Sequence, residues 1–125
     1  MSKALRPKSG TLGDLIDEMA AAAPTAEALV SGDQRIDYAQ LKAQADAFAK
    51  ALIAIDIKRG DRVAVLVTNR IEWIVSAFGA AKIGAIVAAI STFSTPRELA
   101  WALEHSASAA LVTLDGFREI GRAHV

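Results

Sequence analysis

The chain has 125 residues, of which 53% are hydrophobic and 22% are charged, with 14 basic and 14 acidic residues. This composition indicates one folded globular domain and argues against a disordered chain. The formal net charge of zero argues against nucleic acid or an anionic membrane as the main partner, because both usually require a basic excess.

Cysteine is absent, which excludes disulfides and thiolate metal sites and agrees with the cytoplasmic location that we expect. The basic residues within positions 3–8 are followed by no apolar segment, so we interpret residues 1–10 as a flexible terminus and not as a secretory signal. The longest apolar stretch, residues 74–90, is interrupted by Lys82. That interruption indicates a helix followed by a strand, and no transmembrane segment.

The first third of the chain predicts a helix and then a hairpin. Apolar residues recur at helical spacing over residues 12–23, Thr11 is placed to cap this helix, and Pro24 ends it. Two short segments, residues 28–30 and 34–36, are separated by a glycine-containing turn, which is typical of a hairpin.

A second helix begins at Asp37, because Gln40 three residues later completes a capping-box pattern. Leu41, Ala45, Phe48, Leu52 and Ile55 then line one helical face, so the helix extends to about residue 55. A polar turn at residues 58–61 follows it.

Three apolar segments without alternation predict strands at residues 62–67, 85–90 and 109–113. Strands of this kind are usually covered on both faces. Between the first two, Asn69 and Glu72 predict the start of a helix, and Gly84 its end.

A fourth helix is predicted between the second and third strands. Thr95 is its cap, Pro96 its first-turn proline and Glu98 its capping-box acid. This helix runs to about His105.

Strands that alternate with helices predict the fold class α/β. We expect a partial three-layer domain with a mostly parallel sheet of βαβ units, preceded by an N-terminal helix and a short hairpin. Three strands leave apolar edges open, so we expect more chain to complete the sheet.

Parallel sheets bind ligands beyond the carboxyl ends of their strands. The eight glycines form neither of the two common phosphate-binding spacings. Thr68, Asn69 and Arg70 after the first strand are interpreted as a helix cap with a solvated arginine. The hydroxyl-rich loop 91–95 after the second strand, which contains Phe93, is the candidate wall of a ligand groove.

Other polar and aromatic residues are interpreted as structural. His105 and His124 are the only histidines, too few for a histidine-pair metal site, and His105 suits the end of its helix. The carboxylates within residues 14–18 are assigned to a solvated helix face. Trp73 and Trp101 are assigned to the core, because they lie among aliphatic residues at helical positions.

The order of these segments resembles the N-terminal part of the AMP-forming acyl-CoA synthetases, a family related to adenylation domains and firefly luciferase. The similarity runs from about Thr11 to about Thr113. Its segments are IDYAQL (36–41), KRGDRVAV (58–65) followed by NRIEW (69–73), AKIGAIV (81–87), and the helix from PREL (96–99) to HS (105–106). Each segment is a cap, a turn or a buried strand, and none is a catalytic group.

The resemblance implies a two-step reaction in which a carboxylate and Mg-ATP give an acyl-adenylate, from which a thiol, usually coenzyme A, displaces AMP. ATP, Mg²⁺ and coenzyme A are thus implied for the parent protein. The family's phosphate loop, its nucleotide contacts and its C-terminal lysine come later than residue 113. We therefore expect no catalytic residue and no metal site here, no tight cofactor binding, and no activity without the remainder of the protein.

Many family members have asparagine–x–arginine after the second-motif strand, where the arginine suits a coenzyme A phosphate, whereas this chain has Ser91, Thr92 and Phe93. The resemblance then implies a substrate or coenzyme A channel at Phe93 and Ser94, with Arg97 as the substitute for the missing arginine.

Residues 11–118 are assigned to an incomplete AMP-binding ligase domain and residues 119–125 to a non-native tail. The alternative for the tail is the start of an amphipathic helix, with Phe117 and Ile120 facing inward. Two alternatives also remain for function, namely a non-catalytic α/β binding or oligomerisation module and part of an amino-acid adenylation domain.

Overall fold

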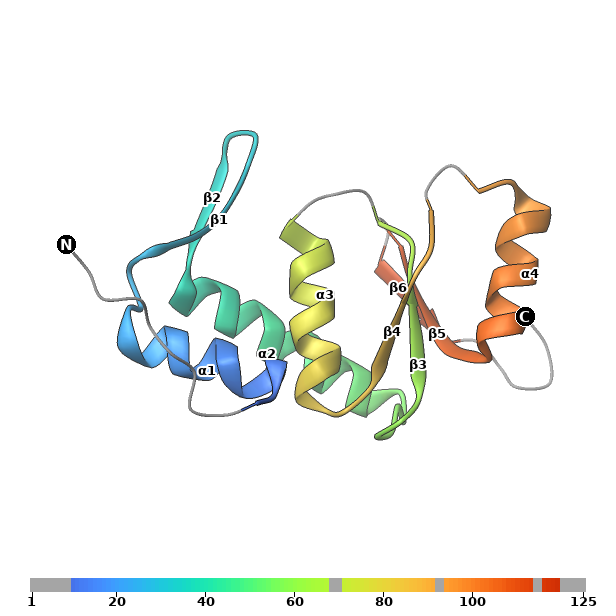
Figure 1. Cartoon of the computed structure of the whole chain (residues 1–125), viewed down its shortest axis with the longest axis horizontal. Helices are drawn as coiled ribbons and strands as arrows, with labels where there is room; N and C mark the ends of the chain where they lie inside the picture. The colour runs from blue at the N-terminus through green and yellow to red at the C-terminus, as the bar shows by residue number, and fades with distance from the viewer. Residues whose placement is uncertain (1–9, 68–70, 92–93, 114–115, 120–125) are drawn as a thin grey trace.

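A computed structural model describes residues 10–67, 71–91 and 94–113 and the backbone of residues 116–119. Three helices lie on one side of a four-stranded sheet and a fourth helix lies on the other side (Figure 1). The α/β class and the three layers expected from the sequence are confirmed.

The N-terminal part contains helix α1 (Leu12–Ala22) and a two-stranded antiparallel hairpin of β1 (Glu27–Ser31) and β2 (Gln34–Asp37). Thr11 caps α1, since its hydroxyl oxygen accepts a hydrogen bond from the backbone N–H of Asp14 at 3.2 Å. The hairpin projects away from the helices (Figure 1). Both elements agree with the sequence prediction.

Helices α2 (Tyr38–Ala54) and α3 (Ile71–Lys82) pack against each other and against α1. The predicted capping box of α2 is present, with both the side chain of Asp37 and that of Gln40 bonded to backbone. Gly84 has φ 75°, a left-handed conformation that favours glycine, and so ends the turn after α3. Asn69, the predicted cap of α3, lies outside the described residues.

The four-stranded sheet has the order β4-β3-β5-β6. Its strands are β3 (Arg62–Val65), β4 (Ile86–Ala89), β5 (Ser108–Thr113) and β6 (Gly116–Glu119). The first three are parallel, as predicted, and β6 pairs antiparallel with β5. The sheet is thus mostly parallel with one antiparallel edge strand.

Strand β6 was not predicted, and the alternative of a helix starting near Phe117 is wrong, because residues 116–119 form a strand. Gly116, the first residue of β6, pairs with Thr113, the last residue of β5. Glu119, the first residue assigned to the non-native tail, is the last residue of β6.

Helix α4 (Pro96–Ser106) begins with the complete capping box of Thr95 and Glu98 and ends at Ala107, which has φ 52°. Helix α3 connects β3 to β4, whereas α4 connects β4 back across β3 to β5. Since both crossovers are right-handed and run in opposite directions along the sheet, α4 lies on the face opposite α2 and α3 (Figure 1). The predicted cap, first-turn proline and end of this helix are confirmed.

The main core lies between the sheet and helices α2 and α3. Its buried members are Leu52, Ile57, Val63, Val65, Val67, Ala80, Ala110 and Val112. A second cluster of Ile16, Leu41, Ile71 and Val75 joins α1 to α2 and α3. Burial of these apolar side chains is the main favourable contribution to folding.

Helix α3 approaches its neighbours closely at a glycine. A Cβ atom built on Gly79 would lie 2.7 Å from Cδ2 of Phe48 and 2.9 Å from the carbonyl oxygen of Ala45, both on α2. Contacts this short do not occur between real side chains, so α2 and α3 pack at this distance only because position 79 lacks a side chain.

We therefore predict that Gly79→Ala destabilises the protein by about 1–3 kcal/mol, because overpacking outweighs the better helix propensity of alanine. Urea unfolding measures the change. Gly10→Ala is the matched control, since nothing lies within 4 Å of its added methyl group, and we expect its effect to stay within about 0.5 kcal/mol. Equal stability of the two variants would contradict the close approach.

Candidate functional site

The carboxyl ends of β3, β4 and β5 lie at one edge of the sheet, where a parallel sheet binds its ligands. Backbone pairing continues there, because the N–H of Ile90 donates to the carbonyl of Val65 at 3.0 Å and the N–H of Leu66 donates to that of Val112 at 2.8 Å. This edge carries the loop in which the sequence placed the substrate channel.

The structure describes two of the three predicted channel residues. Ser94 is half-buried, and its backbone N–H donates to the carbonyl of Ser91 at 3.2 Å. Arg97 is exposed on the first turn of α4. Phe93 lies outside the described residues, as do residues 68–70 after β3.

The capping box of α4 fixes where the loop ends and the helix begins. The backbone N–H of Thr95 donates to the carboxylate of Glu98 at 2.8 Å, and the backbone N–H of Glu98 donates to the hydroxyl of Thr95 at 3.2 Å. The backbone hydrogen bond from Thr95 is the main reason that the pKa of Glu98 is lowered. Ser94 and Arg97 are thereby held on either side of a defined helix start.

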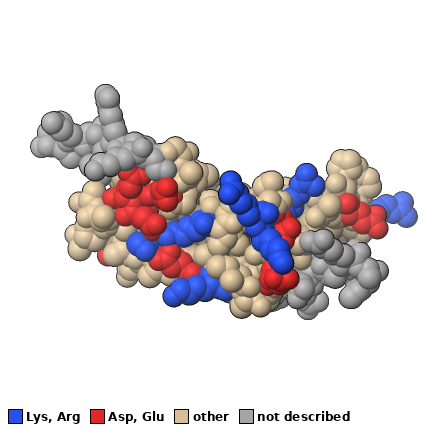
Figure 2. Space-filling model, turned by 90° about the horizontal axis from the view of Figure 1, so that it is seen from below, with Lys and Arg blue, Asp and Glu red and all other residues tan. Residues whose placement is uncertain are grey.

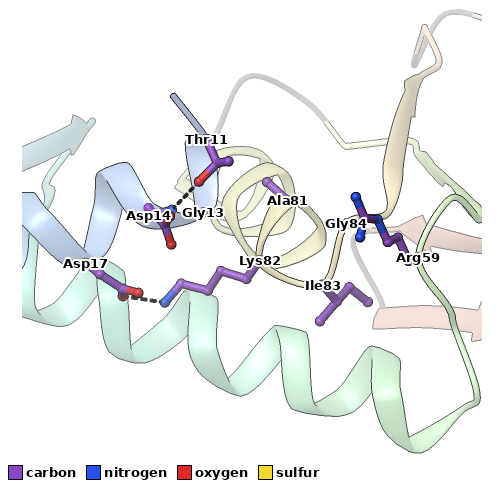
Figure 3. A pocket seen from close by; sticks show the side chains of 9 residues that line it. All are labelled: Thr11, Gly13, Asp14, Asp17, Arg59, Ala81, Lys82, Ile83 and Gly84. Carbon is purple, nitrogen blue, oxygen red and sulfur yellow. Dashed lines mark hydrogen bonds and ion pairs between the residues drawn. The ribbon is translucent and has the colours of Figure 1, made fainter. Parts of the chain in front are cut away.

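A pocket of about 480 Å³ lies at the opposite edge of the sheet (Figure 3). Its lining residues include Gly13 and Asp17 of α1, Lys82 of α3, and Arg59 and Gly84, which precede β3 and β4. Since these last two lie before the amino ends of their strands, this pocket is separate from the predicted channel.

Four charged side chains next to this pocket join the first three helices. Lys82 of α3 contacts Asp17 of α1, with Nζ–Oδ1 2.6 Å, and also Asp46 of α2. Lys42 of α2 lies 2.6 Å from Asp46 and 3.3 Å from Asp17. We call these residues the charge cluster; Figure 2 shows acidic and basic side chains side by side on this face of the molecule.

The charge cluster changes the pKa values of its members. The hydrogen bond from Lys82 is the largest cause of the lowered pKa of Asp17. Burial raises the pKa of Asp46, but the hydrogen bonds and charges of Lys42 and Lys82 together outweigh it, so the pKa is lowered. The pKa of Lys42 is raised, chiefly by its hydrogen bond to Asp46. All three shifts favour the charged forms.

The charge cluster and the position of one tryptophan differ from the sequence prediction. That prediction assigned Asp17 to a solvated face, whereas the structure pairs Asp17 with a lysine 65 positions away. It assigned Trp101 to the core, but Trp101 is 63% exposed and stacks on His105, with ring centroids 4.6 Å apart. The assignment of Trp73 is confirmed, since it packs against the main core.

The chemistry that these residues offer is limited. Among the described residues, no group of three or more histidine, cysteine, aspartate or glutamate side chains is placed to hold a metal ion. Within the same part of the chain, no helix is long and apolar enough to cross a membrane. The described residues therefore provide a loop and a helix start at the carboxyl edge, where the channel is predicted, and a charge-paired scaffold at the amino edge.

We predict that Lys82→Met lowers the free energy of unfolding by about 1–2 kcal/mol, between the values for exposed and buried ion pairs. The reason is that Lys82 is only 12% exposed and its loss leaves two carboxylates with one partner. Lys58→Met is the control, since Lys58 is 68% exposed and contacts only the exposed Asp56. Urea unfolding that ranks the two variants equally would contradict a structural role for the cluster.

The same substitution changes the dependence of stability on pH. Because Asp17 and Asp46 have pKa values below 3.8 in the folded state, their stabilisation is present above that value and is lost as the pH falls through the folded pKa. Urea midpoints measured between pH 6 and about pH 2 should fall less steeply for Lys82→Met than for the parent protein.

Comparisons with known proteins identify the family of the chain. The family model described as AMP-binding enzyme matches residues 16–124. The chain is 36% identical over 110 residues to a putative acyl-CoA synthetase, YngI, of Bacillus subtilis, covering 86% of this chain and 20% of that protein. It is also 36% identical over 103 residues to the long-chain-fatty-acid–CoA ligase FadD13 of Mycobacterium tuberculosis, covering 81% and 20%.

Solved structures of acyl-CoA synthetases and adenylation proteins also resemble the chain. The N-terminal domain of FACL13 from Mycobacterium tuberculosis superposes with a TM-score of 0.80 at 34% identity, covering 84% of this chain and 27% of that one. A fused adenylation–carrier protein, NpsA-ThdA from Klebsiella oxytoca, gives a TM-score of 0.78 at 25% identity, covering 82% and 20%. The chain spans about 20% of the length of the curated relatives that it matches.

The family model matches most of the chain. The matched residues include the four strands of the sheet and the capped helices α2 and α4. The chain therefore belongs to the AMP-binding enzyme family.

Proposed function

We propose that this chain is part of an ATP-dependent carboxylic acid–CoA ligase that forms an acyl-adenylate and then an acyl-CoA. The observation that carries the proposal is the similarity to acyl-CoA synthetases and fatty-acid–CoA ligases, at 36% identity over most of the chain. The adenylation protein from Klebsiella is similar at 25% identity. We accordingly prefer an acyl substrate, of the fatty-acid class, over an amino acid.

In the first step of the proposed reaction, an oxygen of the carboxylate attacks the α-phosphorus of ATP and pyrophosphate leaves. In the second step, the sulfur of coenzyme A attacks the acyl carbonyl carbon, the thiol proton passes to a base, and AMP leaves. Mg²⁺, when bound with ATP, offsets negative charge on the transferring phosphates. Because the described residues form no metal-binding group, we assign no magnesium ligand to this chain.

The part of this chain in the proposed reaction is scaffold and one wall of a channel. Residues 11–118 would be the first portion of the ligase domain. Ser94 and Arg97 flank the start of α4 at the carboxyl edge of the sheet, and Phe93 belongs to the same loop in sequence. An exposed arginine at this edge suits a phosphate of coenzyme A, because a guanidinium group binds phosphate oxygens through paired hydrogen bonds.

We also propose that the complete ligase acts in the cytoplasm, and the absence of cysteine from this chain is compatible with that reducing compartment. ATP, a carboxylic acid and coenzyme A are its proposed small-molecule partners. Because the net charge of this chain is zero, we propose no nucleic acid partner.

The proposal predicts that the protein encoded by the whole reading frame exchanges radiolabelled pyrophosphate into ATP only when a carboxylic acid is present. With coenzyme A added, the same protein should release AMP and form a thioester. The 125-residue chain alone should show no exchange above background, because it includes none of the family's nucleotide-binding segments. Turnover by the 125-residue chain, or none by the complete protein with fatty, aromatic or amino acids, would refute the assignment.

The same assay separates the alternative functions. An amino-acid adenylation enzyme would exchange pyrophosphate with amino acids and would not depend on coenzyme A for product release. A non-catalytic binding or oligomerisation module would exchange with none of the acids, and the 125-residue chain would by itself be monodisperse and melt cooperatively.

A second prediction concerns the channel wall. In the complete protein, Arg97→Ala should raise the KM for coenzyme A by roughly threefold to tenfold, as expected when one charged hydrogen bond to a phosphate is lost. Carboxylate-dependent pyrophosphate exchange, which needs no coenzyme A, should not change. Arg35→Ala is the control, because Arg35 lies in the hairpin and pairs with Glu27. If Arg97→Ala leaves the KM for coenzyme A at the parent value, Arg97 does not line the channel.

A further inference from the structure

Arg62, the first residue of β3, contacts a residue 44 positions later in the chain. Its Nη1 donates a hydrogen bond to the backbone carbonyl of Ser106, the last residue of α4, at 2.9 Å. Since side chains alternate along a strand and that of Val63 is buried in the main core, Arg62 projects toward the opposite face, where α4 lies (Figure 1). The contact joins the amino end of β3 to the carboxyl end of α4.

The end of a helix is a favourable place for this guanidinium group. The carbonyl groups of the last turn have no partner within the helix, and they carry the negative end of the helix dipole. A second contact lies beside the first, because the hydroxyl groups of Ser106 and Ser108 form a hydrogen bond of 2.7 Å and Ser108 is buried. The end of α4 is therefore bonded to β3 as well as to β5, the strand that follows it.

Few other contacts determine the direction of α4. Leu103 is its one buried side chain among the residues that the structure describes. Ala107 is the single residue between α4 and β5, and it has φ 52°, a left-handed conformation that is unfavourable for a residue with a side chain. A single linking residue is a joint about which the helix can turn. The hydrogen bond from Arg62, which comes from the neighbouring strand, restrains that rotation.

The opposite end of α4 carries Arg97, which we assigned to the coenzyme A channel. A helix of 11 residues is about 16 Å long. A rotation of about 10° at its carboxyl end therefore moves its first turn by about 3 Å. A displacement of this size separates a guanidinium group from a phosphate that it would otherwise meet at hydrogen-bonding distance. The direction of α4 accordingly decides whether Arg97 reaches its ligand.

We propose that Arg62 is a positioning residue for the coenzyme A step, because its bond to Ser106 sets the direction of α4 and thereby the place of Arg97. The inference rests on the proposed function, in which Arg97 binds a phosphate of coenzyme A. Arg62 lies at the amino edge of the sheet, and the length of the strands separates it from the channel. It acts through α4 and touches no substrate.

Kinetics of the complete protein test this role. Arg62→Ala should raise the KM for coenzyme A about threefold or more, while carboxylate-dependent pyrophosphate exchange stays at the parent rate. Arg62→Lys should bring the KM back toward the parent value, because an ammonium group donates to the same carbonyl. Arg59→Ala is the matched control and should leave the KM unchanged. It removes the same charge from the preceding turn, where the side chain of Arg59 lies against Gly84.

A double substitution shows whether Arg62 acts through Arg97. If it does, Arg62→Ala adds nothing to the KM of Arg97→Ala, because the group that it positions is already absent. Effects that multiply in the double variant would overturn the proposal. Equal losses of pyrophosphate exchange and of thioester formation, together with a lower urea midpoint, would indicate general destabilisation and would also overturn it.

Deuterium uptake of the complete protein tests the contact without enzyme activity. Backbone amides of α4 should take up deuterium several-fold faster in Arg62→Ala than in the parent protein, because the end of the helix opens more readily. Amides of α2, on the other face of the sheet, should not change. Unchanged uptake over α4 would show that the bond does not hold the helix, and the proposal would fail.

The enzyme assay distinguishes the failure of this inference from that of the proposed function. A complete protein without acid-dependent pyrophosphate exchange would reject the ligase function, and the role of Arg62 in the coenzyme A step with it. An active ligase in which Arg62→Ala keeps the parent KM for coenzyme A would reject this inference alone.

Discussion

Helix α3 packs against α1, α2 and the sheet at the same time, and the positions of the other elements depend on these contacts. Gly79 allows α3 to approach α2 to a distance that a side chain would prevent. At the end of the helix, Gly13 of α1 allows the same approach, because its added Cβ would lie 2.9 Å from the Cα of Lys82. Two glycines on different helices therefore set the spacing of the helical layer.

Paired charges also connect the same three helices. The hydrogen bonds of Lys82 to Asp17 and Asp46 act only at short range, and they occur where the backbones of α1 and α3 are closest. An ion pair of this partial exposure adds little energy by comparison with the core, but it allows few alternative arrangements of the helices. Close packing sets the distance between the helices, and the charge cluster pairs the charged side chains that meet there.

The two ends of the sheet differ in the residues that adjoin them. The amino ends of the strands adjoin the charge cluster and the pocket beside it, where each charge of the cluster already has a partner. At the carboxyl ends, Ser94 and Arg97 occupy the junction of a loop and a helix start. The charged scaffold and the proposed channel are therefore separated by the length of the strands.

Elements that depend on local chemistry could be predicted from the sequence. The capping boxes at Asp37 and Thr95, the turn at Gly84 and the positions of the three parallel strands were all predicted correctly, because each depends on residues only a few positions apart. The parallel order followed from the alternation of strands and helices. The family resemblance was read from these same segments and is confirmed by the matched family model.

Which distant residues meet could be learned only from the folded chain. Asp17 and Lys82 are 65 positions apart, and no local pattern distinguishes their pairing from solvation. Trp101 has the helical spacing of a core residue, yet whether it is buried depends on what lies outside α4, and here it is exposed. Local sequence specifies hydrogen bonds and caps, whereas burial and ion pairing depend on the position of the remaining polypeptide.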